Sequence, residues 1–182
     1  MAEQPAAQTV TPLFTAETIA RRVDEMACDI AACDLRDPII VAVLKGSFVF
    51  AADLIRALHG RGLHPEIDFI FLASYGAGTT GGEVKILRDV ESTIEGRDVV
   101  IVDDILDSGR TLTFAKAHLA ACGAHGVKTC ILLDKTVPRD VKVTPDFIGF
   151  ECPDVFVVGY GMDLAHRYRE LPFIGVVQTD RD

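Results

Sequence analysis

The sequence predicts an α/β domain in which a mainly parallel β-sheet is flanked by helices. Short runs of β-branched and other apolar residues alternate with amphipathic segments along the chain, as they do in successive βαβ units. Residues 99–102 are all β-branched, which is typical of a strand covered by helices on both faces. No repeat, linker or low-complexity segment divides the 182 residues. We therefore expect a single domain over residues 1–182 with a sizeable core.

Three segments are predicted to be helices, because apolar residues recur in them every three or four positions. These segments are residues 15–33, 48–58 and 111–122. The first has the clearest apolar face, which consists of Ile19, Val23, Met26 and Ile30. Glycines follow the second and third segments, and glycine favours the end of a helix.

Eight short apolar runs are predicted to be strands. They are residues 39–44, 67–73, 84–88, 98–103, 127–133, 147–150, 155–158 and 173–177. The two ends of the chain, residues 1–10 and 179–182, are expected to be flexible.

Composition excludes several classes of function. The net charge of −9 argues against binding to nucleic acid through its phosphates. No apolar stretch is long enough to span a membrane, and the first residues lack the features of a secretory signal. The five cysteines show no metal-binding spacing, and most lie among apolar neighbours; they are Cys28, Cys33, Cys122, Cys130 and Cys152. We therefore expect reduced thiols in a cytoplasmic protein.

The segment that follows residues 99–102 combines an acidic pair with a loop suited to phosphate. Asp103 and Asp104 can accept hydrogen bonds from sugar hydroxyls or hold Mg²⁺. In residues 107–111, which begin the next helix, the free backbone N–H groups and the helix dipole favour an anion. Ser108 and Thr111 add hydroxyl donors, and Gly109 allows close approach. A sugar 5-phosphate would satisfy both halves at the carboxyl end of a parallel strand.

Residues 103–111, Asp-Asp-Ile-Leu-Asp-Ser-Gly-Arg-Thr, resemble the phosphoribosyl-pyrophosphate (PRPP) motif of the type I phosphoribosyltransferases. The resemblance implies that family's fold, with a small hood formed by the terminal segments. It places Asp103 and Asp104 at the ribose and Mg²⁺ of PRPP, and it makes Asp107 the general base. The 5′-phosphate would be bound by Asp107, Ser108, Gly109, Arg110 and Thr111. The acidic pair of the family is commonly Glu-Asp, so the first carboxylate of this chain is one methylene shorter.

Two further strand ends resemble the hypoxanthine-guanine branch of the family. Lys45 and Gly46 lie in a Leu-Lys-Gly segment, which implies binding of pyrophosphate. In this branch the peptide bond before the lysine can be cis. Lys135 lies in Leu-Leu-Asp-Lys-Thr, and the resemblance implies that its ammonium donates to the 6-oxo group of a purine.

The C-terminal segment from residue 156 to residue 172 resembles the same branch. The resemblance implies that Phe156 stacks on the base and that the Val157 backbone reads its edge. Asp163 would contact a second Mg²⁺, partly through water, and Arg169 would reach pyrophosphate. Each motif alone also has an ordinary structural reading, such as a core aromatic or a solvated turn. The occurrence of the motifs in family order favours the functional reading.

A glycine-rich segment follows Ser74 and Tyr75, with four glycines in residues 76–82. Such a segment cannot pack a core. In the family it forms a lid led by the Ser-Tyr pair, so we expect a mobile lid over residues 75–90. A plain hairpin or a disordered loop is the alternative.

The resemblance implies a purine salvage enzyme. It would transfer the phosphoribosyl group of PRPP to N9 of a 6-oxopurine with Mg²⁺ as cofactor, as a homodimer or homotetramer, without a nucleic-acid or membrane partner. One alternative is a related regulator that binds nucleotides and RNA, which would need a basic face. The other is a receiver-type phosphoacceptor, which would leave residues 108–111 unexplained.

Overall fold

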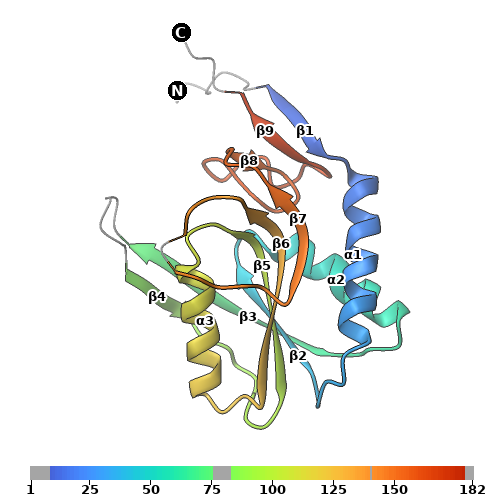
Figure 1. Cartoon of the computed structure of the whole chain (residues 1–182), viewed down its shortest axis with the longest axis vertical. Coiled ribbons are helices and arrows are strands. Elements are labelled where there is room, and N and C mark those ends of the chain that lie inside the picture. The colour runs from blue at the N-terminus through green and yellow to red at the C-terminus, as the bar shows by residue number, and fades with distance from the viewer. Residues whose placement is uncertain (1–8, 76–82, 140, 179–182) are drawn as a thin grey trace, which may run out of the picture.

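A six-stranded sheet forms the centre of the computed structural model, which describes residues 9–75, 83–139 and 141–178. Its strands are β2 (Ile39–Leu44), β3 (Glu66–Tyr75), β4 (Glu83–Arg88), β5 (Asp98–Leu106), β6 (Gly126–Lys135) and β7 (Phe147–Cys152). The spatial order is β4-β3-β2-β5-β6-β7, as Figure 1 shows. Only β4 runs antiparallel to its neighbour. The predicted α/β class with a mainly parallel sheet is confirmed.

Helices cover both faces of this sheet. Helices α1 (Ala16–Ala31) and α2 (Phe48–Gly60) pack on one face, and α3 (Arg110–Ala121) packs on the other. Successive side chains of a strand point to opposite faces. Accordingly, Val100 and Val102 of β5 belong to the cluster beneath α1 and α2, whereas Val99 and Ile101 belong to the cluster beneath α3. The all-β-branched run is therefore buried on both sides, as predicted.

The terminal segments form a second, three-stranded antiparallel sheet. Its strands are β1 (Val10–Phe14), β8 (Val157–Val158) and β9 (Ile174–Val177), in the order β1-β9-β8. This is the expected hood. No local pattern indicated β1, and the prediction of a flexible end was wrong for Val10. The strand is stabilised by pairing with β9, 160 residues further along the chain, and such distant pairing leaves no local pattern.

Two central strands are longer than predicted. β5 continues to Leu106 and β6 to Lys135, because their pairing extends through Ile105–Leu133 and Leu106–Asp134. Asp103 and Asp104 consequently both lie within β5, whereas the predicted strand ended at Asp103, so the expectation is corrected for Asp104. Because they are consecutive strand residues, their side chains leave opposite faces of the sheet.

The cysteines and the helices bear on two further expectations, reduced thiols and no membrane-spanning segment. All five cysteines are free. Among the described residues, no helix has both the length and the apolar character needed to cross a bilayer.

Candidate active site

Two cavities adjoin at the carboxyl ends of β2, β5 and β6. The larger has a volume of about 490 Å³ and the smaller about 260 Å³. Residues that line both include Lys45, Gly46, Asp104, Ile105 and Asp107. β2 and β5 are neighbours in the sheet, and the chain leaves them toward α2 and α3 on opposite faces. Ligands of open α/β sheets bind at such a switch point.

The smaller cavity ends at the loop that begins α3. Asp107, Ser108, Gly109 and Thr111 line this cavity. Gly109 is the N-cap of α3 with a φ of 80°, and a side chain there would collide with the Val141 carbonyl oxygen, 2.7 Å from an added Cβ. The first amides of the helix have no helical acceptor, and such amides favour binding of an anion. Arg110 lines neither cavity, and its amide lies 3.4 Å from the Ser108 hydroxyl.

The acidic pair of β5 lies where the two cavities meet. Asp103 is only 6% exposed and accepts a hydrogen bond from the Asp104 amide at 3.0 Å. Asp103 lines only the smaller of the two cavities, whereas Asp104 lines both. Burial raises the pKa of both carboxyls, and the neighbouring Asp104 carboxylate raises that of Asp103 further. Two uncompensated carboxylates of this kind favour a cation between them and the solvent.

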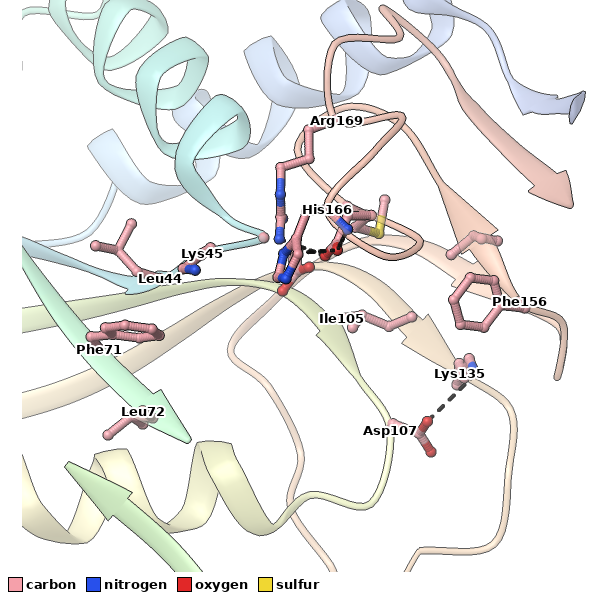
Figure 2. Close-up of a pocket in the computed structure, with 15 residues that line it drawn as sticks. Leu44, Lys45, Phe71, Leu72, Ile105, Asp107, Lys135, Phe156, His166 and Arg169 are labelled. Carbon is pink, nitrogen blue, oxygen red and sulfur yellow. Dashed lines mark hydrogen bonds and ion pairs between the residues drawn. The ribbon is translucent and has the colours of Figure 1, made fainter. Parts of the chain in front are cut away.

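Lys45 and Arg169 lie on the β2 side of the larger cavity (Figure 2), and Asp163, the ion-pair partner of Arg169, also lines this cavity. Lys45 follows the cis peptide bond Leu44–Lys45, and its ammonium lies 5.5 Å from the centre of the Phe71 ring. Arg169 forms an ion pair of 2.5 Å with Asp163 and donates to the Gly161 carbonyl at 2.5 Å. Two cations at one wall suit a polyanion such as pyrophosphate.

Gly46 joins three segments of the site through close backbone contacts. A Cβ at Gly46 would lie 1.8 Å from an Asp104 carboxylate oxygen, and a Cβ at Gly161 would lie 2.2 Å from the Gly46 carbonyl oxygen. A side chain at Gly46 would displace the Asp104 carboxylate, and one at Gly161 would collide with the Gly46 backbone and separate the end of β2 from the loop that carries Asp163 and Arg169. The glycine of the Leu-Lys-Gly segment is therefore required by packing.

The other wall of the larger cavity suits a flat heterocycle. The Lys135 ammonium lies 3.5 Å from the Asp107 carboxylate and 3.7 Å from that of Asp154, and Figure 2 shows Lys135 and Asp107 facing each other beside Phe156. The Phe156 side chain is 54% exposed, although an aromatic ring of this size is normally buried. Val157 is buried in β8 behind it.

Sequence reasoning missed several residues of the larger cavity. His166 lines it with an 84% exposed side chain, and its amide donates to Asp163 at 2.8 Å. Leu44, Phe71, Leu72, Ile105 and Met162 supply apolar lining. The positions of Phe71 and Leu72 near the end of a parallel strand were the sequence feature that could have identified them as lining residues.

Ser74 and Tyr75 end β3 opposite Val84 and Glu83. Residues 76–82 lie outside the described residues, so the lid stays a prediction.

The chain matches the phosphoribosyl transferase domain over residues 10–165. It belongs to the phosphoribosyltransferase family. It is 42% identical over 169 residues to the hypoxanthine-guanine phosphoribosyltransferase of Bacillus subtilis, with 91% of this chain and 92% of that protein covered. A crystal structure of a hypoxanthine-guanine phosphoribosyltransferase from Bacillus anthracis superposes with a TM-score of 0.87 and 44% identity, covering 94% of this chain and 100% of that one.

A bifunctional TilS/HprT protein of Listeria innocua is 41% identical over 170 residues. The match covers 92% of this phosphoribosyltransferase chain but only 26% of the Listeria protein. These similarities confirm the resemblance to the hypoxanthine-guanine branch that the motifs indicated.

The carboxylates of this phosphoribosyltransferase fit Mg²⁺. Within the described segments, no three His, Cys, Asp or Glu side chains converge to hold a metal by themselves. Mg²⁺ is commonly held by one or two carboxylates together with substrate oxygens and water. Asp103 and Asp104, with their raised pKa values, provide that kind of partial site beside the two cavities.

Asp103→Asn is expected to stabilise the metal-free protein at neutral pH. Because the pKa of Asp103 is raised on folding, the folded chain keeps this proton at pH values where the unfolded chain has lost it. Ionisation therefore disfavours folding increasingly as pH rises above the unfolded value, and asparagine avoids this cost. In EDTA, the Tm difference from wild type should grow between pH 4.5 and 7.5, at roughly 2–4 °C per kcal/mol. The exposed Asp34→Asn is the control, and a pH-independent difference would contradict the assignment.

Gly46→Ala is expected to impair the site without unfolding the domain. The added methyl group must displace Asp104, and a displacement of about 1 Å can cost on the order of 10²-fold in rate. Gly60→Ala is the matched control, because a Cβ at Gly60 meets nothing within 4 Å. Calorimetric titration with PRPP and Mg²⁺ measures the effect, and equal affinity in the two variants would rule out the proposed packing constraint.

Proposed function

We propose that this chain is a purine salvage enzyme that transfers the 5-phosphoribosyl group of PRPP to N9 of hypoxanthine, giving IMP, and of guanine, giving GMP. Pyrophosphate is the second product. The arrangement of the two cavities carries the proposal: an anion loop at one end, a lysine and an exposed phenylalanine at the other, and the acidic pair between them. The family match and the identity to the Bacillus subtilis enzyme support it.

Each part of the two substrates has a matching surface in this proposal. The 5′-phosphate binds the loop of Asp107, Ser108, Gly109, Arg110 and Thr111, and the ribose hydroxyls face Asp103 and Asp104. Pyrophosphate binds Lys45, Gly46 and Arg169. The purine binds Lys135, Phe156 and the Val157 backbone.

The contact between Lys135 and Asp107 suits the edge of a 6-oxopurine. In such a base, O6 and N7 are neighbouring polar atoms on one edge. The ammonium of Lys135 donates to O6, and the carboxylate of Asp107, 3.5 Å away, accepts the proton of N7. Asp107 thus acts as the general base, while the exposed Phe156 ring stacks on the face of the base.

Departure of pyrophosphate leaves positive charge on the ribose and places negative charge on the leaving group. Lys45 and Arg169 stabilise the leaving group from the β2 side, and Asp104 faces the ribose. Mg²⁺ would be held by Asp103 and Asp104, with a second ion near Asp163 partly through water. It would supply further neutralisation of the pyrophosphate charge. A lid over residues 75–90, led by Ser74 and Tyr75, excludes water during this step.

The proposal also covers the setting of the enzyme. It is a cytoplasmic homodimer or homotetramer that acts on small molecules, with no nucleic-acid or membrane partner. The match to the phosphoribosyl transferase domain removes the receiver-type phosphoacceptor as an alternative.

The deciding experiment incubates the purified chain with PRPP, Mg²⁺ and hypoxanthine, guanine or xanthine, and follows ultraviolet absorbance. We expect IMP and GMP to form and formation to stop in EDTA. If no purine yields a nucleotide, the proposed function is wrong. A shift of RNA by the same preparation at physiological salt would then favour the nucleotide-binding regulator.

Asp107→Asn is expected to lower kcat by about 10²–10⁴-fold, the usual contribution of a general base, while PRPP binding changes little. Asp154→Asn is the matched control, because Asp154 also contacts Lys135, at 3.7 Å, but with a carboxylate that is 75% exposed. Steady-state kinetics with hypoxanthine measures both variants. Similar losses in both would trace the effect to Lys135 and contradict the role of Asp107 as base.

A further inference from the structure

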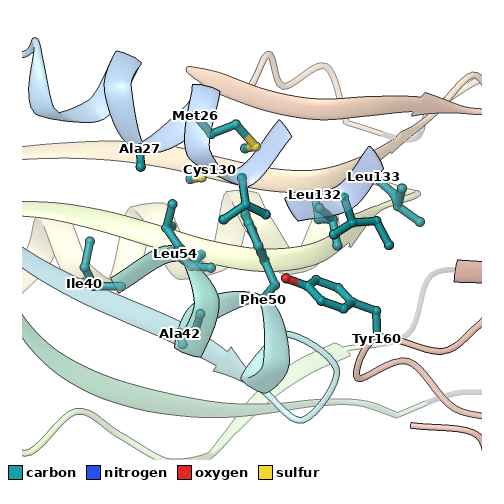
Figure 3. Packing of buried hydrophobic residues seen from close by; sticks show 14 of the residues in the cluster. Met26, Ala27, Ile40, Ala42, Phe50, Leu54, Cys130, Leu132, Leu133 and Tyr160 are labelled. Carbon is teal, nitrogen blue, oxygen red and sulfur yellow. The ribbon is translucent and has the colours of Figure 1, made fainter. Parts of the chain in front are cut away.

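A partly buried hydrogen bond connects the C-terminal loop of the site to helix α2. The Tyr160 hydroxyl donates to the Asp53 carboxylate at 2.6 Å, across 107 residues of sequence. Tyr160 is 6% exposed, and Figure 3 shows its ring reaching into the apolar cluster beside Phe50. The other oxygen of Asp53 pairs with Arg56. Burial, and secondarily the Asp53 carboxylate, raise the pKa of Tyr160, so the hydroxyl stays a donor.

The backbone at Tyr160 has a conformation that is unfavourable for tyrosine. Its φ is 51°, and the flanking Gly159 and Gly161 have φ values of 95° and 101°. The left-handed region is unfavourable for a residue with a side chain, so surrounding contacts must maintain it. The Tyr160 amide donates to the Leu171 carbonyl at 2.8 Å, and the hydroxyl bond to Asp53 fixes the other end of the residue.

The two residues of this hydrogen bond belong to the two segments assigned to pyrophosphate. Asp53 lies in α2, which begins directly after Lys45 and Gly46. Tyr160 adjoins Gly161, whose carbonyl accepts from the Arg169 guanidinium and whose amide donates to the Arg169 carbonyl. Gly161 also packs on the Gly46 carbonyl oxygen. A change at Tyr160 or Asp53 is therefore expected to alter how Arg169 faces Lys45, whereas Lys135 and Phe156 form no hydrogen bond or ion pair with Tyr160 or Asp53 in the described part of the chain.

We propose that Tyr160 and Asp53 are positioning residues for pyrophosphate, which set the distance between the Lys45 loop and Arg169. The inference rests on the proposed function and deepens it by naming the residues that fix the leaving-group site. Loss of the hydrogen bond between Tyr160 and Asp53 is expected to change the affinity for one substrate and not for the other. Affinity for PRPP and pyrophosphate depends on this hydrogen bond, and affinity for the purine does not.

The test compares Tyr160→Phe with Tyr168→Phe. Both substitutions remove one hydroxyl from the same loop, and in the described part of the chain the Tyr168 hydroxyl has no hydrogen-bond partner. For Tyr160→Phe we expect the KM for PRPP and the calorimetric Kd for pyrophosphate with Mg²⁺ to rise about tenfold, because a hydrogen bond to a charged group contributes more than one between neutral groups. The KM for hypoxanthine should stay within about twofold, and Tyr168→Phe should match wild type.

Asp53→Asn distinguishes loss of the hydrogen bond between Tyr160 and Asp53 from a general loss of folded structure. Asparagine keeps an acceptor for the Tyr160 hydroxyl, so its effect on PRPP should be smaller than that of Tyr160→Phe. The double variant should resemble Tyr160→Phe rather than show the product of the two effects. Equal changes in the KM values for PRPP and hypoxanthine, a lower Tm with unchanged pyrophosphate affinity, or multiplicative effects would overturn the inference. If the wild-type chain forms IMP in the same assay, these outcomes would contradict only the positioning role of Tyr160 and Asp53. The proposed function would still hold.

Discussion

The active site depends on close backbone packing at Gly46. This residue touches the Asp104 carboxylate on one side and Gly161 on the other, so the end of β2, the end of β5 and the C-terminal loop meet at one point. Each segment brings one kind of chemistry: the Lys45 cation, the acidic pair, and the Asp163–Arg169 ion pair. Protein interiors transmit small displacements rather than absorbing them. The relative positions of these groups therefore depend on the absence of a side chain at Gly46.

The electrostatics of the site are local rather than global. A chain with a net charge of −9 repels polyanions at long range, so anion binding has to come from groups at short range. Lys45, Lys135 and Arg169 line the larger cavity together, and the start of α3 supplies backbone amides to the smaller one. Asp103 and Asp104 add negative charge where a ribose and a cation are expected, and the raised pKa values of this pair record how poorly the protein alone compensates it.

Local patterns predicted most of the central sheet, because β-branched runs and helical periodicity report burial directly. They also predicted the acidic pair and the loop of residues 107–111 at a strand end, whereas Lys45 and Lys135 were indicated by the family resemblance. What the sequence did not reveal arises from contacts between distant segments: the β1–β9 pairing, the extension of β5 past Asp103, and the Tyr160–Asp53 hydrogen bond. Motif comparison indicated that Asp163 and Arg169 were important, but only the fold shows that they pair with each other.

The hood has a consequence for the order in which the molecule is completed. β9 lies between β1 and β8, so β1 has no partner in this sheet until β9 has been made. The central sheet, with its nearer pairings, is able to form earlier during synthesis. Val157 belongs to β8, which pairs with β9. The loop of residues 107–111 is therefore made before the strand that contains Val157 has its partner.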